Sequence, residues 1–192
     1  MSSLLDNLMQ QLGGDTIQQI GRQLGTDSAT TSTAVSAALP ALLSALARNA
    51  QSPAGAGALA SALDKDHDGS VLNDLPGLLG AGGGAGASIL GHIFGAKQEV
   101  VSQGVGATAG LGKAQSAQLL AMLAPIVMGV LGSAKRSKGL DAGGLASMLG
   151  QERGRIGAPT GGLGSLMQLI DQDGDGSVID DVGGMLGKML GR

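Results

Sequence analysis

The chain has 192 residues, a formal net charge of −3, only 14% charged residues and no cysteine. It therefore lacks the basic surface expected of a nucleic-acid-binding protein, and it cannot form disulfides or thiolate metal sites. Hydrophobic residues make up 43% of the chain, but Phe94 is the sole aromatic residue, so the core must be aliphatic. Abundant glycine and alanine allow helices to approach closely, and we expect an all-α protein.

The N-terminal segment predicts two short helices. Apolar residues at helical spacing indicate a helix over residues 2–12, and Gly13 with Gly14 should end it. We expect Asp15 to cap a second helix and Gly25 to end that helix.

A longer helix should follow, capped by Asp27 or Ser28. Pro40 lies inside this segment, so the pattern leaves open a kink or a junction between two helices. Residues 51–57 are typical of a linker, and residues 57–64 predict a short helix that leads into an acidic segment. The glycine-rich residues 81–88 predict a flexible hinge.

The pattern then recurs farther along the chain. Pro40 and Pro125 are separated by 125 − 40 = 85 residues, and Gly25 and Gly110 have the same separation. We infer an internal duplication, with a first helical repeat over residues 1–80 and a second over 89–192.

Two acidic segments also recur, at residues 64–74 and 171–181, with a separation of 171 − 64 = 107. The second repeat should therefore contain an insertion of 107 − 85 = 22 residues, and the polar stretch 151–162 is its natural position.

Both acidic segments have the spacing of an EF-hand calcium loop, D-x-D-x-D-G. Alternate carboxylates on a curling loop converge on one point, and calcium accepts many oxygen ligands at loose geometry. We therefore expect two calcium sites and a helix-loop-helix at the end of each repeat. The candidate ligands are Asp64, Asp66, Asp68, Ser70 and Asp74 in the first loop, and Asp171, Asp173, Asp175, Ser177 and Asp181 in the second. The alternative is an acidic turn that caps a helix without an ion.

The loops depart from the EF-hand pattern at their last position. The bidentate glutamate expected there is replaced by Leu75 in one loop and Val182 in the other. Asp74 and Asp181 precede these residues and could close a shorter loop. Because aspartate reaches less far than glutamate, we expect weaker calcium binding than in sensor EF-hands.

The sequence resembles the bacterial YidB-like family, catalogued as a domain of unknown function. The resemblance is carried by LLDNLMQQLGGDTIQQIGRQLG, AALPALLSALARNA, ILGHIFG and GLGKAQSAQLLAMLAPIVMGVLG. It covers roughly residues 1–135 and implies an all-helical fold. It implies no established activity, and it provides no catalytic residues to transfer.

Other features give weaker signals. The Gly91–Gly95 spacing favours close helix contacts or self-association. His92 is isolated from other catalytic residue types in the sequence, so we expect a structural role. The uncharged window from Ala114 to Ala134 is long enough to cross a membrane, but its glutamines, serine and proline favour a buried helix.

The sequence therefore favours a non-catalytic calcium-binding structural protein that self-associates. The alternatives are a calcium-responsive regulator that binds a partner protein and a membrane-associated helical protein, and an enzyme is the weakest hypothesis. We expect neither nucleic-acid binding nor membrane insertion. The N-terminus lacks the pattern of a secretory signal, so we expect a cytoplasmic protein, with non-classical export as an open alternative.

Overall fold

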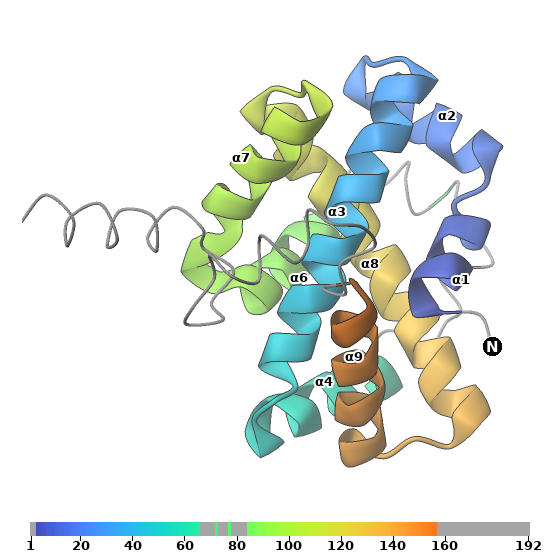
Figure 1. The fold of residues 1–192 in the computed structure, drawn as a ribbon, viewed down its shortest axis with the longest axis vertical. Helices are drawn as coiled ribbons and strands as arrows, with labels where there is room; N and C mark the ends of the chain where they lie inside the picture. Colours follow the sequence, from blue (N-terminus) through green and yellow to red (C-terminus); the bar gives the residue numbers. More distant parts are fainter. Residues whose placement is uncertain (1–2, 66–71, 73–76, 78–83, 157–192) are drawn as a thin grey trace, which may run out of the picture. The chain divides into compact units, whose positions relative to one another are not determined.

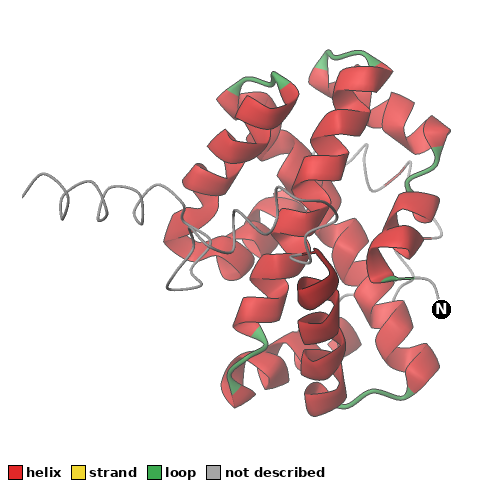
Figure 2. Cartoon of the chain, in the orientation of Figure 1, coloured by secondary structure: helices red, strands yellow, loops and turns green. Residues whose placement is uncertain are grey.

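A computed structural model describes residues 3–65, 72, 77 and 84–156. The chain divides into two compact units, residues 1–156 and 157–192, and the second lies wholly outside the described residues. Throughout the described part every regular element is helical and none is a strand (Figure 2), which confirms the predicted all-α class.

Helix α1 spans Leu4–Gln11 and begins at a capping box. The Ser3 hydroxyl accepts a hydrogen bond from the Asp6 backbone N–H at 3.0 Å. The Asp6 carboxylate in turn accepts from the Ser3 backbone N–H at 2.9 Å. This reciprocal pair satisfies two backbone donors that the helix cannot pair internally. The hydrogen bonds with Ser3 also hold the pKa of Asp6 below its usual value.

Helix α2 spans Gly14–Leu24, and its N-cap is Gly13. The predicted cap, Asp15, instead lies in the first turn, where its charge complements the helix dipole. Gly25 ends the helix as predicted, with a φ of 68° that suits glycine.

Helix α3 spans Ser28–Asn49, and Asp27 is its N-cap. The Asp27 carboxylate accepts from the backbone N–H groups of Ala29 and Thr30, both at 2.9 Å. The helix continues through Pro40, so this segment is one helix and the alternative of two helices meeting at the proline is wrong.

Helix α4 spans Pro53–Lys65, so the predicted linker ends at residue 52. Proline is well suited to the first position of a helix, because its fixed φ is helical and no backbone N–H is lost there. Gly55 allows the chain to turn sharply into α4, since a Cβ at this position would lie 1.9 Å from the Asn49 carbonyl oxygen.

Helix α6 spans Gly84–Phe94, a 3-10 turn follows at Gly95–Lys97, and α7 spans Gln98–Ala109. Residues 84–88 of the predicted 81–88 hinge are thus the first turns of a helix, which corrects that part of the prediction. Residues 81–83 lie outside the described residues. Glycine alone does not prevent a helix where tertiary packing supports it.

The last two described helices are α8 (Lys113–Lys138) and α9 (Ala142–Ile156). Residues 151–156, the first part of the predicted insertion, belong to α9, whereas 157–162 lie outside the described residues.

Helices α3 and α8 form the centre of the described unit, and the other helices pack around them (Figure 1). The contact between α6 and α8 is close at Gly86, where a Cβ would lie 1.7 Å from the Ala121 carbonyl oxygen. By contrast, a Cβ at Gly91 or Gly95 would meet no atom of the described residues within 4 Å, so the predicted glycine spacing does not join α6 to α8.

The same local structure occurs before α3 and before α8. Before α3 the Thr26 backbone N–H donates to the Gly21 carbonyl oxygen, and before α8 the Leu111 backbone N–H donates to the Gly106 carbonyl oxygen, both at 2.9 Å. A Cβ at Gly21 would lie 2.8 Å from Thr31 Oγ1. Glycine is thus required where α2 turns toward α3.

The turn before α8 has the same requirement for glycine. A Cβ at Gly106 would lie 2.7 Å from Ser116 Oγ, and Ser116 is buried as Thr31 is. The spacing of both pairs is 85, because 106 − 21 = 85 and 116 − 31 = 85.

The two predicted repeats share one core as far as residue 156. Helix α3 contacts α7, α8 and α9, which come from the second predicted repeat. The Gln115 side-chain amide, at the start of α8, donates to the Leu24 carbonyl at the end of α2 at 2.8 Å. Residues 1–156 therefore form one compact unit.

Candidate functional site

Of the ten predicted calcium ligands, only Asp64 lies among the described residues. The other nine lie outside them: Asp66, Asp68, Ser70, Asp74, Asp171, Asp173, Asp175, Ser177 and Asp181. Asp64 is the penultimate residue of α4, and its side chain is 55% exposed. An exposed carboxylate at the end of an entering helix is the position of the first ligand in an EF-hand.

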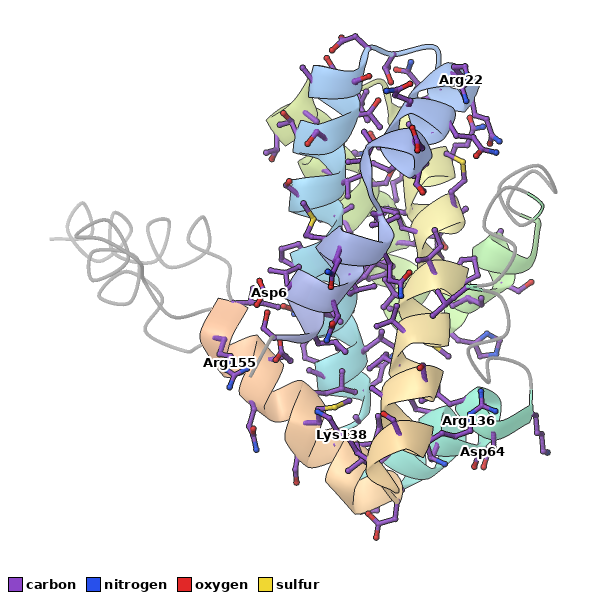
Figure 3. The ribbon with its side chains drawn as sticks, turned by 90° about the vertical axis from the view of Figure 1, so that its right-hand side faces the viewer. Asp6, Arg22, Asp64, Arg136, Lys138 and Arg155 are labelled. Atoms are coloured by element: carbon purple, nitrogen blue, oxygen red, sulfur yellow. The ribbon has the colours of Figure 1, made fainter. Side chains whose placement is uncertain are left out.

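The Asp64 carboxylate forms an ion pair with Lys135 in the last turn of α8. The Lys135 side chain is only 13% exposed, so its hydrocarbon stem is mostly covered while the ammonium reaches Asp64. Figure 3 shows Asp64 near Arg136, the next residue of α8. Positive charge at the C-terminal end of α8 also complements the helix dipole.

Within the described ranges, no group of three or more histidine, aspartate or glutamate side chains could hold a metal ion. Asp64 by itself therefore does not form a complete site, and any calcium site that includes it needs the remaining loop residues.

One cavity has a volume of about 680 Å³ and lies between α3, α4 and α6; we call it the α4–α6 cavity. Its walls include the apolar side chains of Leu59 and Ile89, with Arg48, Asn49 and His92 among the polar lining residues. The Asn49 amide donates to the carbonyl oxygens of His92 and Ile93, at 3.2 and 3.0 Å, and so caps the end of α6.

His92 has a structural contact of its own. Its Nδ1 lies 2.8 Å from the Ser88 carbonyl oxygen, one turn earlier in α6. This contact fits the structural role that was predicted for His92.

Another cavity has a volume of about 300 Å³ and is lined by residues of α1, α8 and α9, together with Leu72; we call it the α1–α9 cavity. It contains Glu152, whose residue surface is only 5% exposed. Glu152 Oε1 accepts a hydrogen bond from Arg155 at 3.0 Å, whereas Oε2 is buried and has no hydrogen-bond partner within the part of the chain that the structure describes. This buried carboxylate was not identified from the sequence.

Helices α3 and α8 each contain a window long and apolar enough to cross a membrane. Half of the α3 window and 78% of the α8 window are buried within the protein. Much of the apolar surface of both helices therefore packs against other helices.

Comparison with curated proteins found no match, and comparison with solved structures found none either. A family model described as "Bacterial protein of unknown function (DUF937)" matches residues 6–134, which is more than half of the 192-residue chain. The match includes the first acidic segment and ends within α8, before α9 and the second acidic segment. The chain therefore belongs to the DUF937 family of bacterial proteins of unknown function.

Proposed function

We propose that this protein is a non-catalytic, calcium-binding structural protein built from two similar helical halves. The observation that carries the proposal is the position of Asp64, exposed at the end of α4 where the first D-x-D-x-D-G segment begins. The same motif recurs at residues 171–181. Calcium would use Asp64 as its first ligand and fix the end of α4 to the residues that follow.

The proposal of two similar halves is supported by the turns before α3 and α8. Gly25 and Gly110 both have left-handed backbone angles, with φ of 68° and 69°. The buried hydroxyls of Thr31 and Ser116 face Gly21 and Gly106, and each lies too close to its glycine to leave room for a Cβ. Composition alone would not place the same contacts at the same spacing.

The two cavities add independent support. The α4–α6 cavity lies between the end of α3, α4 and α6, and the α1–α9 cavity lies between the end of α8, α9 and α1. Lining residues of one cavity correspond to lining residues of the other at a difference of 85. The corresponding pairs are Leu4 and Ile89, Asn7 and His92, Arg48 and Ser133, Asn49 and Ala134, and Ser52 and Ser137.

Calcium that binds only the folded chain stabilises it by mass action. At a concentration about ten times the Kd, each site adds about 1.4 kcal/mol. For a chain of this size, that gain raises the Tm by about 3–6 °C.

The test is thermal unfolding followed by circular dichroism, in chelator and then in millimolar calcium or magnesium. The variants are Asp64→Asn, Asp171→Asn and the double variant, with Asp15→Asn as a control that removes an exposed carboxylate outside the loops. We expect calcium to raise the Tm, each single variant to lose part of the rise, and the double variant to lose all of it. If calcium leaves the wild-type Tm unchanged, the loops do not bind the ion and the proposal is wrong.

Self-association is the second part of this proposal. Gly91 in α6 and Gly95 in the 3-10 turn are exposed, and a Cβ at either position would meet no described atom within 4 Å. This surface could therefore contact a helix of another subunit. Light scattering in chelator and in calcium measures the mass directly. A monomer in both conditions would contradict the self-association and leave calcium binding to be judged by the melting experiment.

A calcium-responsive regulator is the second candidate function, and the position of α4 favours it. This helix carries Asp64 at one end and also forms a wall of the α4–α6 cavity. A calcium-driven shift of α4 would widen the cavity and expose its apolar walls to a partner, as in sensor EF-hands. Fluorescence of a hydrophobic dye should rise with calcium if the cavity opens, and it should not change if calcium only stabilises the fold.

A further inference from the structure

The α1–α9 cavity contains a buried acceptor that no described residue pairs. The Glu152 side chain is 6% exposed, and its Oε2 has no hydrogen-bond partner among the described residues. Buried carboxylates are normally satisfied by donors on both oxygens, because desolvation without a partner is unfavourable. A ligand that donates a hydrogen bond to Oε2 would remove this cost.

Two cationic side chains also line this cavity. The Arg155 guanidinium pairs with Glu152 Oε1 through one nitrogen, and its side chain is 57% exposed. Lys138, the last residue of α8, is exposed as well, and Figure 3 labels both residues. The cavity therefore combines a buried negative group with positive groups that reach solvent.

The rest of the lining suits a small organic molecule. Leu4, Val130 and Met148 supply apolar surface, and the volume of about 300 Å³ is at the small end of ligand pockets. A calcium ion fits less well, because it needs six to eight oxygen ligands and would be repelled by Lys138 and Arg155.

We propose that the α1–α9 cavity binds a small zwitterion, such as a free amino acid with an aliphatic side chain. The ammonium group donates to Glu152 Oε2, and the carboxylate accepts from Lys138 and Arg155. The aliphatic side chain contacts the apolar wall. The groups that would bind the zwitterion are not candidate calcium ligands, although Leu72 of the first acidic loop also lines the cavity.

The test is a titration of the isotope-labelled full-length chain, followed by NMR, with alanine and leucine as probes. Propionate lacks the ammonium group and propylamine lacks the carboxylate, so these two compounds separate the contributions of the charges. All titrations are run in chelator, so that bound calcium does not contribute to the shifts. We expect saturable shifts with the amino acids, and binding at least about tenfold weaker with either single-charge compound.

Two variants and one matched control locate the site. Glu152→Gln keeps the shape but removes the charge, and it should weaken alanine binding by about tenfold or more. Ser133→Leu fills the cavity from its exposed rim and leaves Glu152 intact, so it should also abolish binding. Glu99→Gln removes a surface carboxylate outside the cavity and should bind like the wild type.

No saturable shifts with millimolar alanine or leucine would overturn the inference. Equal binding by wild type and folded Glu152→Gln would overturn it as well, and so would equal binding by folded Ser133→Leu. If Glu152→Gln fails to fold, the Ser133→Leu result alone decides.

Discussion

Lys135 and Asp64 form an ion pair that joins the end of α8 to the end of α4, although 71 residues separate them in the sequence. Asp64 is also the first predicted ligand of the first calcium loop. The same carboxylate therefore has two competing partners, a lysine within the protein and a proposed calcium ion. To bind Asp64, calcium would have to displace the Lys135 ammonium or share the carboxylate with it. This competition would lower the apparent affinity of the loop for calcium.

Replacing Lys135 with methionine should strengthen calcium binding. Methionine retains most of the covered hydrocarbon stem and removes the positive charge beside Asp64. We expect the affinity to rise by about two- to tenfold, because a nearby unit charge at the surface contributes about 1 kcal/mol. Calorimetric titration of the full-length chain measures the change.

The matched control for this variant is Lys113→Met, which removes the surface lysine that pairs with Glu99. That change lowers the positive charge by the same amount outside the Asp64–Lys135 pair. Equal affinities of Lys135→Met and Lys113→Met would show that Lys135 does not compete for Asp64.

Replacing two glycines of α7 with alanine should change the free energy of unfolding in opposite directions. A Cβ at Gly106 would lie 2.7 Å from Ser116 Oγ and 2.8 Å from the Leu111 carbonyl oxygen, whereas one at Gly104 would meet nothing within 4 Å. We expect Gly106→Ala to lower the free energy of unfolding by about 1–3 kcal/mol. Gly104→Ala should raise it by about 0.5–1 kcal/mol, since alanine favours the helix. Urea unfolding measures both, and equal effects would contradict the close packing of this turn.

Local signals account for much of the fold that the sequence predicted. Asp27 caps the start of α3 with its side-chain oxygens, and Gly25 ends α2 with a left-handed backbone. Both helix ends can be predicted because few residue types meet these needs. Pro40 and residues 84–88 were harder to interpret, because proline and glycine weaken a helix without forbidding it. Buried contacts along α3 stabilise the helix around Pro40, and the packing of α6 against α8 stabilises the helix that includes residues 84–88.

One kind of candidate site can be predicted from the sequence and the other cannot. The acidic loops are recognisable from sequence because their ligands are close together along the chain. Glu152 was missed because residues 151–162 were interpreted as an insertion. A signal was present, since Leu145, Leu149 and Glu152 follow the i, i+4, i+7 spacing of one helix face, and all three are buried. What the sequence could not provide is the set of residues from α1 and α8 that complete the cavity.

The crossing of α6 and α8 should depend on Gly86. A Cβ there would lie 1.7 Å from the Ala121 carbonyl oxygen, so alanine would force two backbones apart. We expect Gly86→Ala to destabilise the protein by about 3 kcal/mol or more, since backbone cannot move aside as a flexible side chain can. Gly91→Ala in the same helix is the control and should be neutral or stabilising. A Gly86→Ala protein with the wild-type Tm would contradict this contact.

The cap of α3 should make stability depend on acid pH. Hydrogen bonds from Thr30 hold the pKa of Asp27 below its usual value, so the folded state binds this proton less tightly than the unfolded state. The stabilising effect of the charge is therefore present above about pH 4 and is lost as the pH falls through the folded pKa.

Asp27→Asn keeps an oxygen acceptor but does not titrate. We expect the wild type to have a higher Tm than Asp27→Asn at pH 7, and we expect this difference in Tm to shrink below about pH 4. Asp27→Ala, which has no acceptor, should melt lowest at both pH values. Melting curves by circular dichroism decide, and a wild-type advantage that stays constant across this range would show that the Asp27 charge does not stabilise α3.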